Sequence, residues 1–264
     1  MKTLTYIWHD CFVYNDPRLT IIFDYWKDPT CLPGQLPAFI QHADKSKPIY
    51  IVVSHHHKDH YTKQIFEWST LFDNIKYILS KDVAKYARHI LHPDSIYKGI
   101  KPAPESVVVL TPGQTYSDNN IDVKAYGSTD IGNSYCISVA GKSIFHAGDL
   151  NAWIWKDEST EEEVDKAIND FEDILDTIAT DHKVIDFAMF PVDSRIGREY
   201  FTGAKTFVRK FDVKKFFPMH FGLGDTPGEQ NKYQIDATRI DLYANPERGE
   251  YVCLQSPYAA FATP

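Results

Sequence analysis

The chain has 264 residues, of which 43% are hydrophobic and 24% charged, so it is long enough to bury a core without disulfides and has the composition of a globular protein. Its formal net charge of −8 excludes a surface that is basic throughout, as binding to nucleic-acid phosphates requires. The four cysteines include no C-x-x-C pair, which excludes a zinc ribbon and a thioredoxin-type motif.

The first residues do not have the pattern of a targeting segment. The apolar stretch that follows Met1 and Lys2 is interrupted by His9 and Asp10 before it reaches the length of a signal peptide. No apolar run in the sequence is long enough for a membrane span. We therefore expect a cytoplasmic protein with no membrane partner and no nucleic-acid partner.

The first half of the sequence predicts a series of short β-strands. They are rich in β-branched and aromatic residues, and they span residues 4–8, 20–23, 49–54, 75–79 and 107–110. A helix is expected to begin at a capping Ser80 and to run through Leu91, because apolar residues recur there at helical spacing.

The second half of the sequence also predicts a series of short β-strands. Its predicted strands span residues 121–125, 135–139, 143–146, 185–190, 215–218 and 251–254. A long amphipathic helix is predicted over residues 160–180, with an apolar stripe on one face. The acidic residues 161–163 favour its N-terminus through the helix dipole, and we interpret them as solvated.

The arrangement of these elements predicts the fold class. No linker rich in Gly, Ser or Pro separates the two halves, so we expect a single domain over residues 1–264. Strands with interspersed helices suit two β-sheets packed together and covered by helices on their outer faces. The prediction is an α/β protein with an αβ/βα four-layer sandwich.

A dense cluster of potential metal ligands follows the predicted buried strand at residues 49–54. The next six residues, 55–60, read H-H-H-K-D-H. Zinc and its first-row neighbours bind imidazole nitrogen and carboxylate oxygen. Alternation after a strand places His55 and His57 on a common face, and His56 is expected to point away.

Asp59 and His60 could hold a second ion close to the first, as dinuclear hydrolases require. The alternative is that residues 55–60 form an exposed polar loop that binds no metal. Two distant candidate ligands also have a structural alternative. Asp149 could be an ordinary turn residue, and His220 could be a histidine of the core. His9 could support a metal site, or it could pack in the protein without a role at that site.

The pattern H-x-H-x-D-H at residues 55–60 resembles the signature of the metallo-β-lactamase fold superfamily, and the resemblance extends over most of the chain. Residues 5–9 and 21–24 are similar to the opening hairpin of that superfamily, in which an Asp at the place of Asp24 supports the site.

Two later segments carry the resemblance further. The sequence F-H-A-G-D at residues 145–149 is similar to the strand whose terminal Asp bridges two metals, and P-M-H-F-G at residues 218–222 is similar to the strand that delivers the last His. Within the superfamily, the chain most resembles the branch of ascorbate-6-phosphate lactonase and similar cytoplasmic hydrolases.

The resemblance implies a site for one or two divalent ions, either zinc or manganese or iron. The metal ligands that it implies are His55, His57, Asp59, His60, Asp149 and His220. In this arrangement the first two histidines hold one ion, Asp149 bridges, and the remaining three residues hold the other.

One departure from the family pattern concerns the loop at residues 126–132. The family has a metal-ligand His there, whereas this sequence reads Y-G-S-T-D-I-G. Asp130, a hydroxyl of Ser128 or Thr129, or His146 from the neighbouring strand replaces it, or the site is one ligand short. If Asp130 is the replacement, the oxygen-rich ligand set favours Mn²⁺ or Fe²⁺ over zinc.

The resemblance implies hydrolysis of a small-molecule substrate, with an ionised water as the attacking group and Asp59 as a catalytic residue that relays a proton. Ester, lactone, thioester, amide and phosphodiester bonds all fit. The substrate is expected to be anionic if Arg195 or Arg198 binds it, and the alternative is that both belong to an ordinary surface loop. Tyr61 and residues 153–155 could line a pocket or fill the core.

Two other functions compete with hydrolysis. A flavo-diiron redox protein shares the implied fold, but such proteins carry a carboxylate where His57 stands and usually a flavin domain. A metal-binding protein that has lost catalysis is the other alternative, because of the loop without a His. A homo-oligomer is compatible with the sequence.

Overall fold

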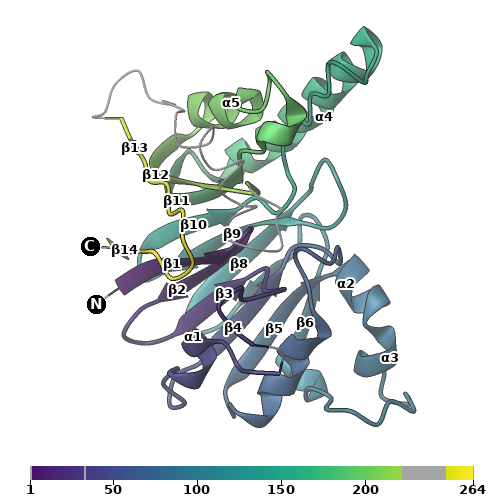
Figure 1. The fold of residues 1–264 in the computed structure, drawn as a ribbon, viewed down its shortest axis with the longest axis vertical. Helices are drawn as coiled ribbons and strands as arrows, with labels where there is room; N and C mark the ends of the chain where they lie inside the picture. The colour runs from purple at the N-terminus through teal and green to yellow at the C-terminus, as the bar shows by residue number, and fades with distance from the viewer. Residues whose placement is uncertain (1, 33, 222–247, 264) are drawn as a thin grey trace. The chain divides into compact units, whose positions relative to one another are not determined.

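The computed structural model describes residues 2–32, 34–221 and 248–263 (Figure 1). The chain divides into two compact units, Met1–Thr111 with Leu254–Pro264, and Pro112–Cys253. Each unit is built around one seven-stranded sheet. The predicted α/β class with two sheets is confirmed, and the expectation of a single domain stays a prediction.

The sheet of the first unit has an antiparallel and a parallel part. Its strands are β1 (Lys2–Trp8), β2 (Cys11–Asn15), β3 (Thr20–Phe23), β4 (Ile49–Val53), β5 (Ile75–Ser80), β6 (Val107–Leu110) and β14 (Ala260–Thr263). Their order is β14-β1-β2-β3-β4-β5-β6. Pairing is antiparallel from β14 to β3 and parallel from β3 to β6. All residues of β4 are buried, as is typical of a central parallel strand.

The helices of the first unit are short. They are α1 (Ala38–Gln41), η1 (Lys63–Thr70), α2 (Lys81–Tyr86), α3 (Arg88–Leu91) and η2 (Pro104–Ser106). The continuous helix predicted from Ser80 to Leu91 is wrong, because the backbone leaves the helical conformation at Ala87, where ψ is 10°. Ser80 ends β5 and precedes α2 without a side-chain capping bond. Val83, Ala87 and Ile90 of the predicted apolar face are nevertheless buried.

The sheet of the second unit repeats the same plan. Its strands are β7 (Thr115–Ser117), β8 (Ile121–Tyr126), β9 (Ser134–Val139), β10 (Lys142–His146), β11 (Val184–Pro191), β12 (Asp212–Met219) and β13 (Glu250–Tyr251). Their order is β13-β12-β11-β10-β9-β8-β7. The strands from β7 to β10 pair antiparallel, and those from β10 to β13 pair parallel.

The long helix predicted over residues 160–180 is confirmed as α4 (Glu161–Asp181). It begins with a capping box, in which Thr160 and Glu163 exchange side-chain and backbone hydrogen bonds. The other helices of this unit are η3 (Ser194–Ile196) and α5 (Thr202–Lys210). Sequence patterns missed α5 because Gly203 lies in it, and a Cβ at that position would meet the Asn151 Oδ1 at 1.9 Å.

Several strands also differ from the prediction. The strands β2, β7 and β14 were not predicted, and the strand expected at residues 251–254 is only the short β13. No helix in the described parts of the chain combines the length and the apolar character needed to cross a membrane.

Polar residues gather where the parallel strands end. In the first unit, Asp24 follows β3 and residues 55–60 follow β4. In the second unit, Asp149, Asp193 and His220 come after β10, β11 and β12. Because the carboxyl ends of parallel strands meet at one edge, each sheet collects its candidate ligands there.

Candidate metal centre

Residues 55–60 form a tight turn directly after β4. The amides of His60 and Tyr61 both donate to the carbonyl oxygen of His57 at 3.0 Å. The turn brings His55 Nε2 to 3.0 Å from His57 Nδ1. Two nitrogens on one tetrahedral zinc ion are about 3.3 Å apart, since each bond is roughly 2.0–2.1 Å long. The spacing of these two imidazoles therefore suits a shared ion.

Asp24 holds two imidazoles of this turn in place. Its carboxylate accepts hydrogen bonds from the Ser54 amide at 2.7 Å, from the Ser54 hydroxyl, and from His60 Nδ1 at 2.9 Å. Because the hydroxyl of Ser54 donates its one proton to Asp24, it accepts from His55 Nδ1 at 2.9 Å. Both histidines thus carry a proton on Nδ1 and present Nε2 as an electron-pair donor.

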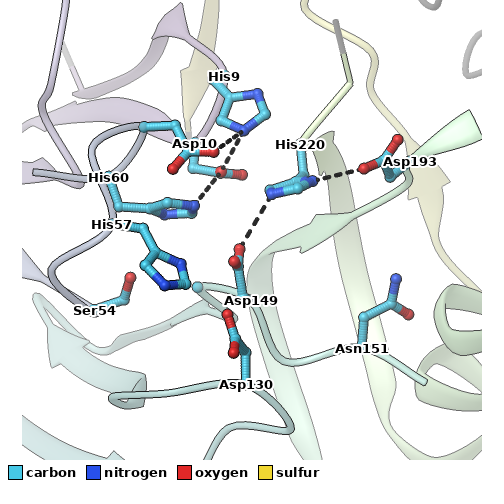
Figure 2. Close-up of polar contacts among 12 residues, drawn as sticks. His9, Asp10, Ser54, His57, His60, Asp130, Asp149, Asn151, Asp193 and His220 are labelled. Atoms are coloured by element: carbon cyan, nitrogen blue, oxygen red, sulfur yellow. Dashed lines mark hydrogen bonds and ion pairs between the residues drawn. The ribbon is translucent and has the colours of Figure 1, made fainter. Parts of the chain in front are cut away.

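A further group of imidazoles and carboxylates surrounds His60 (Figure 2). Asp10 Oδ2 lies 3.3 Å from both His60 Nε2 and His9 Nε2, and Asp59 Oδ2 lies 3.6 Å from His9 Nε2. Ligand atoms of His9, Asp59 and His60 lie within 4.8 Å of one another. The side chain of Asp59 is 26% exposed, whereas His9, Asp10 and His60 are buried.

In the second unit, His220 lies between two carboxylates at the end of β12 (Figure 2). Its Nδ1 donates to Asp193 Oδ2 at 3.0 Å, and its Nε2 lies 3.3 Å from Asp149 Oδ1. Burial alone would raise the pKa of Asp193, but hydrogen bonds from His220 and Arg195 hold that pKa well below its usual range. Asp193 therefore stays ionised and keeps the proton on Nδ1 of His220.

Two side chains that were candidates for substrate contacts have structural partners. The Arg195 guanidinium donates to both carboxylate oxygens of Asp193 through Nε at 2.9 Å. Trp153 Nε1 donates to the Asp149 carbonyl oxygen at 2.8 Å, and its ring packs edge to face with the His220 ring at 5.3 Å. Both side chains fix the residues around His220.

The loop without the family histidine places Asp130 beside Asp149, with ligand atoms within 4.8 Å. The Thr129 hydroxyl donates to the Asn151 carbonyl oxygen at 2.6 Å and accepts from the Asn151 amide at 3.1 Å. The Ser128 hydroxyl accepts from the Asp130 amide at 3.3 Å. Both hydroxyls thus bond to backbone groups, and the replacement of the family histidine by Asp130 stays a prediction.

His146, the remaining alternative, is buried in β10. Its Nδ1 accepts a hydrogen bond from the Gly148 amide at 3.2 Å, and Gly148 has a φ of 53°. The bond shapes the turn that carries Asp149. Among the described residues, the groups of clustered ligand atoms do not include His146.

Three residues of these groups have a left-handed backbone conformation. The φ angles are 56° at His9, 41° at Asp24 and 60° at His220. This conformation costs a residue with a Cβ about 1–2 kcal/mol, and such strain concentrates at functional sites. The surrounding contacts must therefore stabilise these three positions.

Sequence reasoning missed Asp10, Ser54 and Asp193 as parts of the site. Asp10 follows His9 in the turn between β1 and β2, so the H-D pair after a predicted strand was an available signal. Asp193 follows a predicted parallel strand, where ligand-facing residues collect. The contact between Ser54 and Asp24 depends on strand register and had no local signal.

The donor set of each unit fits a divalent first-row metal. In the first unit, imidazole nitrogens and carboxylate oxygens lie close together, and His55 and His60 have Nδ1 engaged. In the second unit, His220 likewise has Nδ1 engaged, and its Nε2 faces a carboxylate. Histidines that bind metal are typically held in this way by their other ring nitrogen.

Comparison with known proteins identifies both a family and a fold. Residues 3–168 match a family model described as a beta-lactamase superfamily domain. None of the curated proteins compared with the chain matches it.

Similar solved structures include Igni18, a metallo hydrolase from Ignicoccus hospitalis, with 14% identity, a TM-score of 0.61, and coverage of 100% of this chain and 99% of that chain. CmlA, a diiron β-hydroxylase from Streptomyces venezuelae, has 14% identity and a TM-score of 0.64 over 99% of this chain and 54% of that one. YhfI from Bacillus subtilis, a metallo-β-lactamase fold protein, has 9% identity and a TM-score of 0.60, with 98% of each chain covered. At these identities the likeness concerns the fold.

The role of Asp24 can be tested with a matched pair of variants. Asp24→Asn removes the acceptor that fixes the proton on His60 Nδ1, so we expect the affinity for Mn²⁺ or Zn²⁺ to fall about 10- to 100-fold. Asp82→Asn is the control, because Asp82 accepts from the amide and Nδ1 of His56 in the same loop at 2.8 and 3.0 Å. Calorimetric metal titration of both variants measures the difference, and equal losses would contradict the assignment.

Proposed function

Because the chain belongs to the beta-lactamase superfamily and has its fold of two mixed seven-stranded sheets with flanking helices, we propose that it is a metal-dependent hydrolase of a small molecule. The observation that supports this function is the fixed orientation of three histidines. His55, His60 and His220 each have Nδ1 bonded to a hydroxyl or carboxylate oxygen. An imidazole held in this way offers Nε2 to a metal.

The proposed ligands are those that the sequence predicts, with Asp130 in place of the absent family histidine. His55, His57 and Asp130 would hold one ion, Asp59, His60 and His220 the other, and Asp149 would bridge. The family resemblance supports the sharing of ions among these residues. The contacts within each unit support the orientation of its own ligands. His9 and Asp10 join the proposed site through their contacts with Asp59 and His60.

Divalent ions in such a site lower the pKa of water toward neutrality and polarise the oxygen of the bond under attack. The residues of the chain supply orientation and proton transfer. Asp59 is the proposed proton relay, because its carboxylate is partly exposed and lies 3.6 Å from His9 Nε2. His9 in turn lies 3.3 Å from Asp10, so a proton taken by Asp59 has nearby groups to which it can pass.

We prefer hydrolysis to redox chemistry because of the identity of one proposed ligand, His57. The fold does not decide, since CmlA, with a similar fold, is a diiron β-hydroxylase. Flavo-diiron proteins carry a carboxylate at the position of His57, where this chain has an imidazole beside His55. An ester, lactone or phosphoester is the proposed bond, on analogy with the family.

Substitution of His57 tests the function. His57→Ala should reduce hydrolysis by the metal-loaded protein at least about 100-fold, since even the partners of metal ligands contribute 10- to 100-fold. The matched control is His42→Ala, an exposed histidine of the same unit. Initial rates on lactones, carboxylic esters and phosphodiesters give the readout. A wild-type protein inactive on all three classes would favour the metal-binding alternative, and a fully active His57→Ala protein would contradict the proposal.

The metal preference depends on Asp130. With this carboxylate as a ligand, we expect protein purified without added metal to contain Mn²⁺ or Fe²⁺, because oxygen-rich ligation shifts preference away from zinc. Asp130→His should shift the content toward zinc. Elemental analysis of the two proteins from the same growth medium measures the shift. Tightly held zinc alone in the unmodified protein would count against Asp130 as a ligand.

A further inference from the structure

The turn after β4 has two functional faces. Along residues 55–60, the candidate metal ligands alternate with residues of another kind, His56 and Lys58. These two side chains and the following Tyr61 line a cavity of about 580 Å³ within the first unit. One short loop therefore carries metal ligands and also forms the wall of a separate cavity.

The cavity has a cationic wall. Lys58 and Lys63 both line it, and both are exposed. Neither lysine forms an ion pair with the described part of the chain. No carboxylate is among the lining residues, although the chain as a whole has a net charge of −8. Asp82, which does not line the cavity, accepts hydrogen bonds from the amide and Nδ1 of His56.

Neutral donors lie beside the lysines. Thr62 Oγ1 accepts from the Gln64 amide at 3.4 Å, so the hydroxyl proton is available to another acceptor. Tyr61 also lines the cavity, and burial raises the pKa of its phenol well above the usual value. Its hydroxyl therefore remains a donor. A wall of ammonium groups and hydroxyls suits a bound oxyanion.

Aromatic rings form another part of the wall. The side chain of Tyr86 is 60% exposed, which is unusual for so large a ring. Its centroid lies 5.0 Å from the His56 ring at 34° and 6.1 Å from the Tyr61 ring at 87°. Exposed ring faces of this kind can pack against a sugar or another flat part of a ligand.

We propose that this cavity binds the oxyanion of an anionic substrate, a phosphate monoester or a carboxylate, whose scissile bond lies at the metal ligands on the other face of the turn. The inference rests on the proposed hydrolase function and names the substrate class. The cavity volume lies within the range of small-molecule sites, about 300–1,000 Å³. Arg195, which the sequence offered as a contact for an anionic substrate, is instead bonded to Asp193.

Binding of inorganic phosphate, phenyl phosphate and acetate to the full metal-loaded chain tests the inference by isothermal titration calorimetry. The double variant Lys58→Gln, Lys63→Gln should bind phosphate at least about tenfold more weakly than wild type. Lys45→Gln, an exposed lysine of the same unit, is the control for charge and should bind normally. Tighter binding of phenyl phosphate than of inorganic phosphate is expected from the ring wall. Preference between phosphate and acetate identifies which oxyanion the substrate carries.

A His57→Ala protein separates the cavity from the metal centre. We expect it to retain phosphate affinity within about twofold while it loses hydrolysis. If it loses as much phosphate affinity as the double lysine variant, or if that variant binds like wild type, the cavity is not the anion site. If His57→Ala hydrolyses substrates normally, the proposed function fails, and the phosphate titration still decides the cavity. Equal melting temperatures for all variants exclude unfolding as the cause.

Discussion

The hydrogen bond from histidine Nδ1 to a buried carboxylate is the interaction on which the rest of the candidate site depends. Asp24 accepts it from His60 and Asp193 accepts it from His220, at 2.9 and 3.0 Å. Each bond fixes the tautomer and the ring plane, and so decides which nitrogen faces the other ligands. The cluster of donors around His60 and the contact of His220 with Asp149 both follow from it.

The two sheets provide this bond by the same structural means. In each unit, a carboxylate at the end of one parallel strand bonds to a histidine that follows the adjacent strand, from β3 to β4 and from β11 to β12. In each pair one partner has a positive φ, Asp24 in the first unit and His220 in the second. Strand ends at a common edge supply the proximity, and the strained backbone residue turns the side chain toward its partner.

The local parts of this arrangement could be predicted from the sequence, and the parts set by strand register could not. The ligands at residues 55–60 follow a strand within one turn, so spacing alone indicated that His55 and His57 meet. Asp10 contacts His60 and Asp193 contacts His220, and both partners lie far away in the sequence. The periodicity of the sequence does not indicate such contacts. The loop that lacks the family histidine left several replacements open, and the sequence did not indicate that its two hydroxyls bond to backbone groups.

The most direct test of this account is ¹⁵N NMR spectroscopy of the histidine ring nitrogens in the full chain, without metal and then with Zn²⁺ as a diamagnetic probe. The account predicts the Nδ1-protonated tautomer for His55, His60 and His220 in the metal-free protein, and shifts at Nε2 of the same rings on metal addition. Protons on Nε2, or metal-induced shifts at Nδ1 of these three residues, would contradict it.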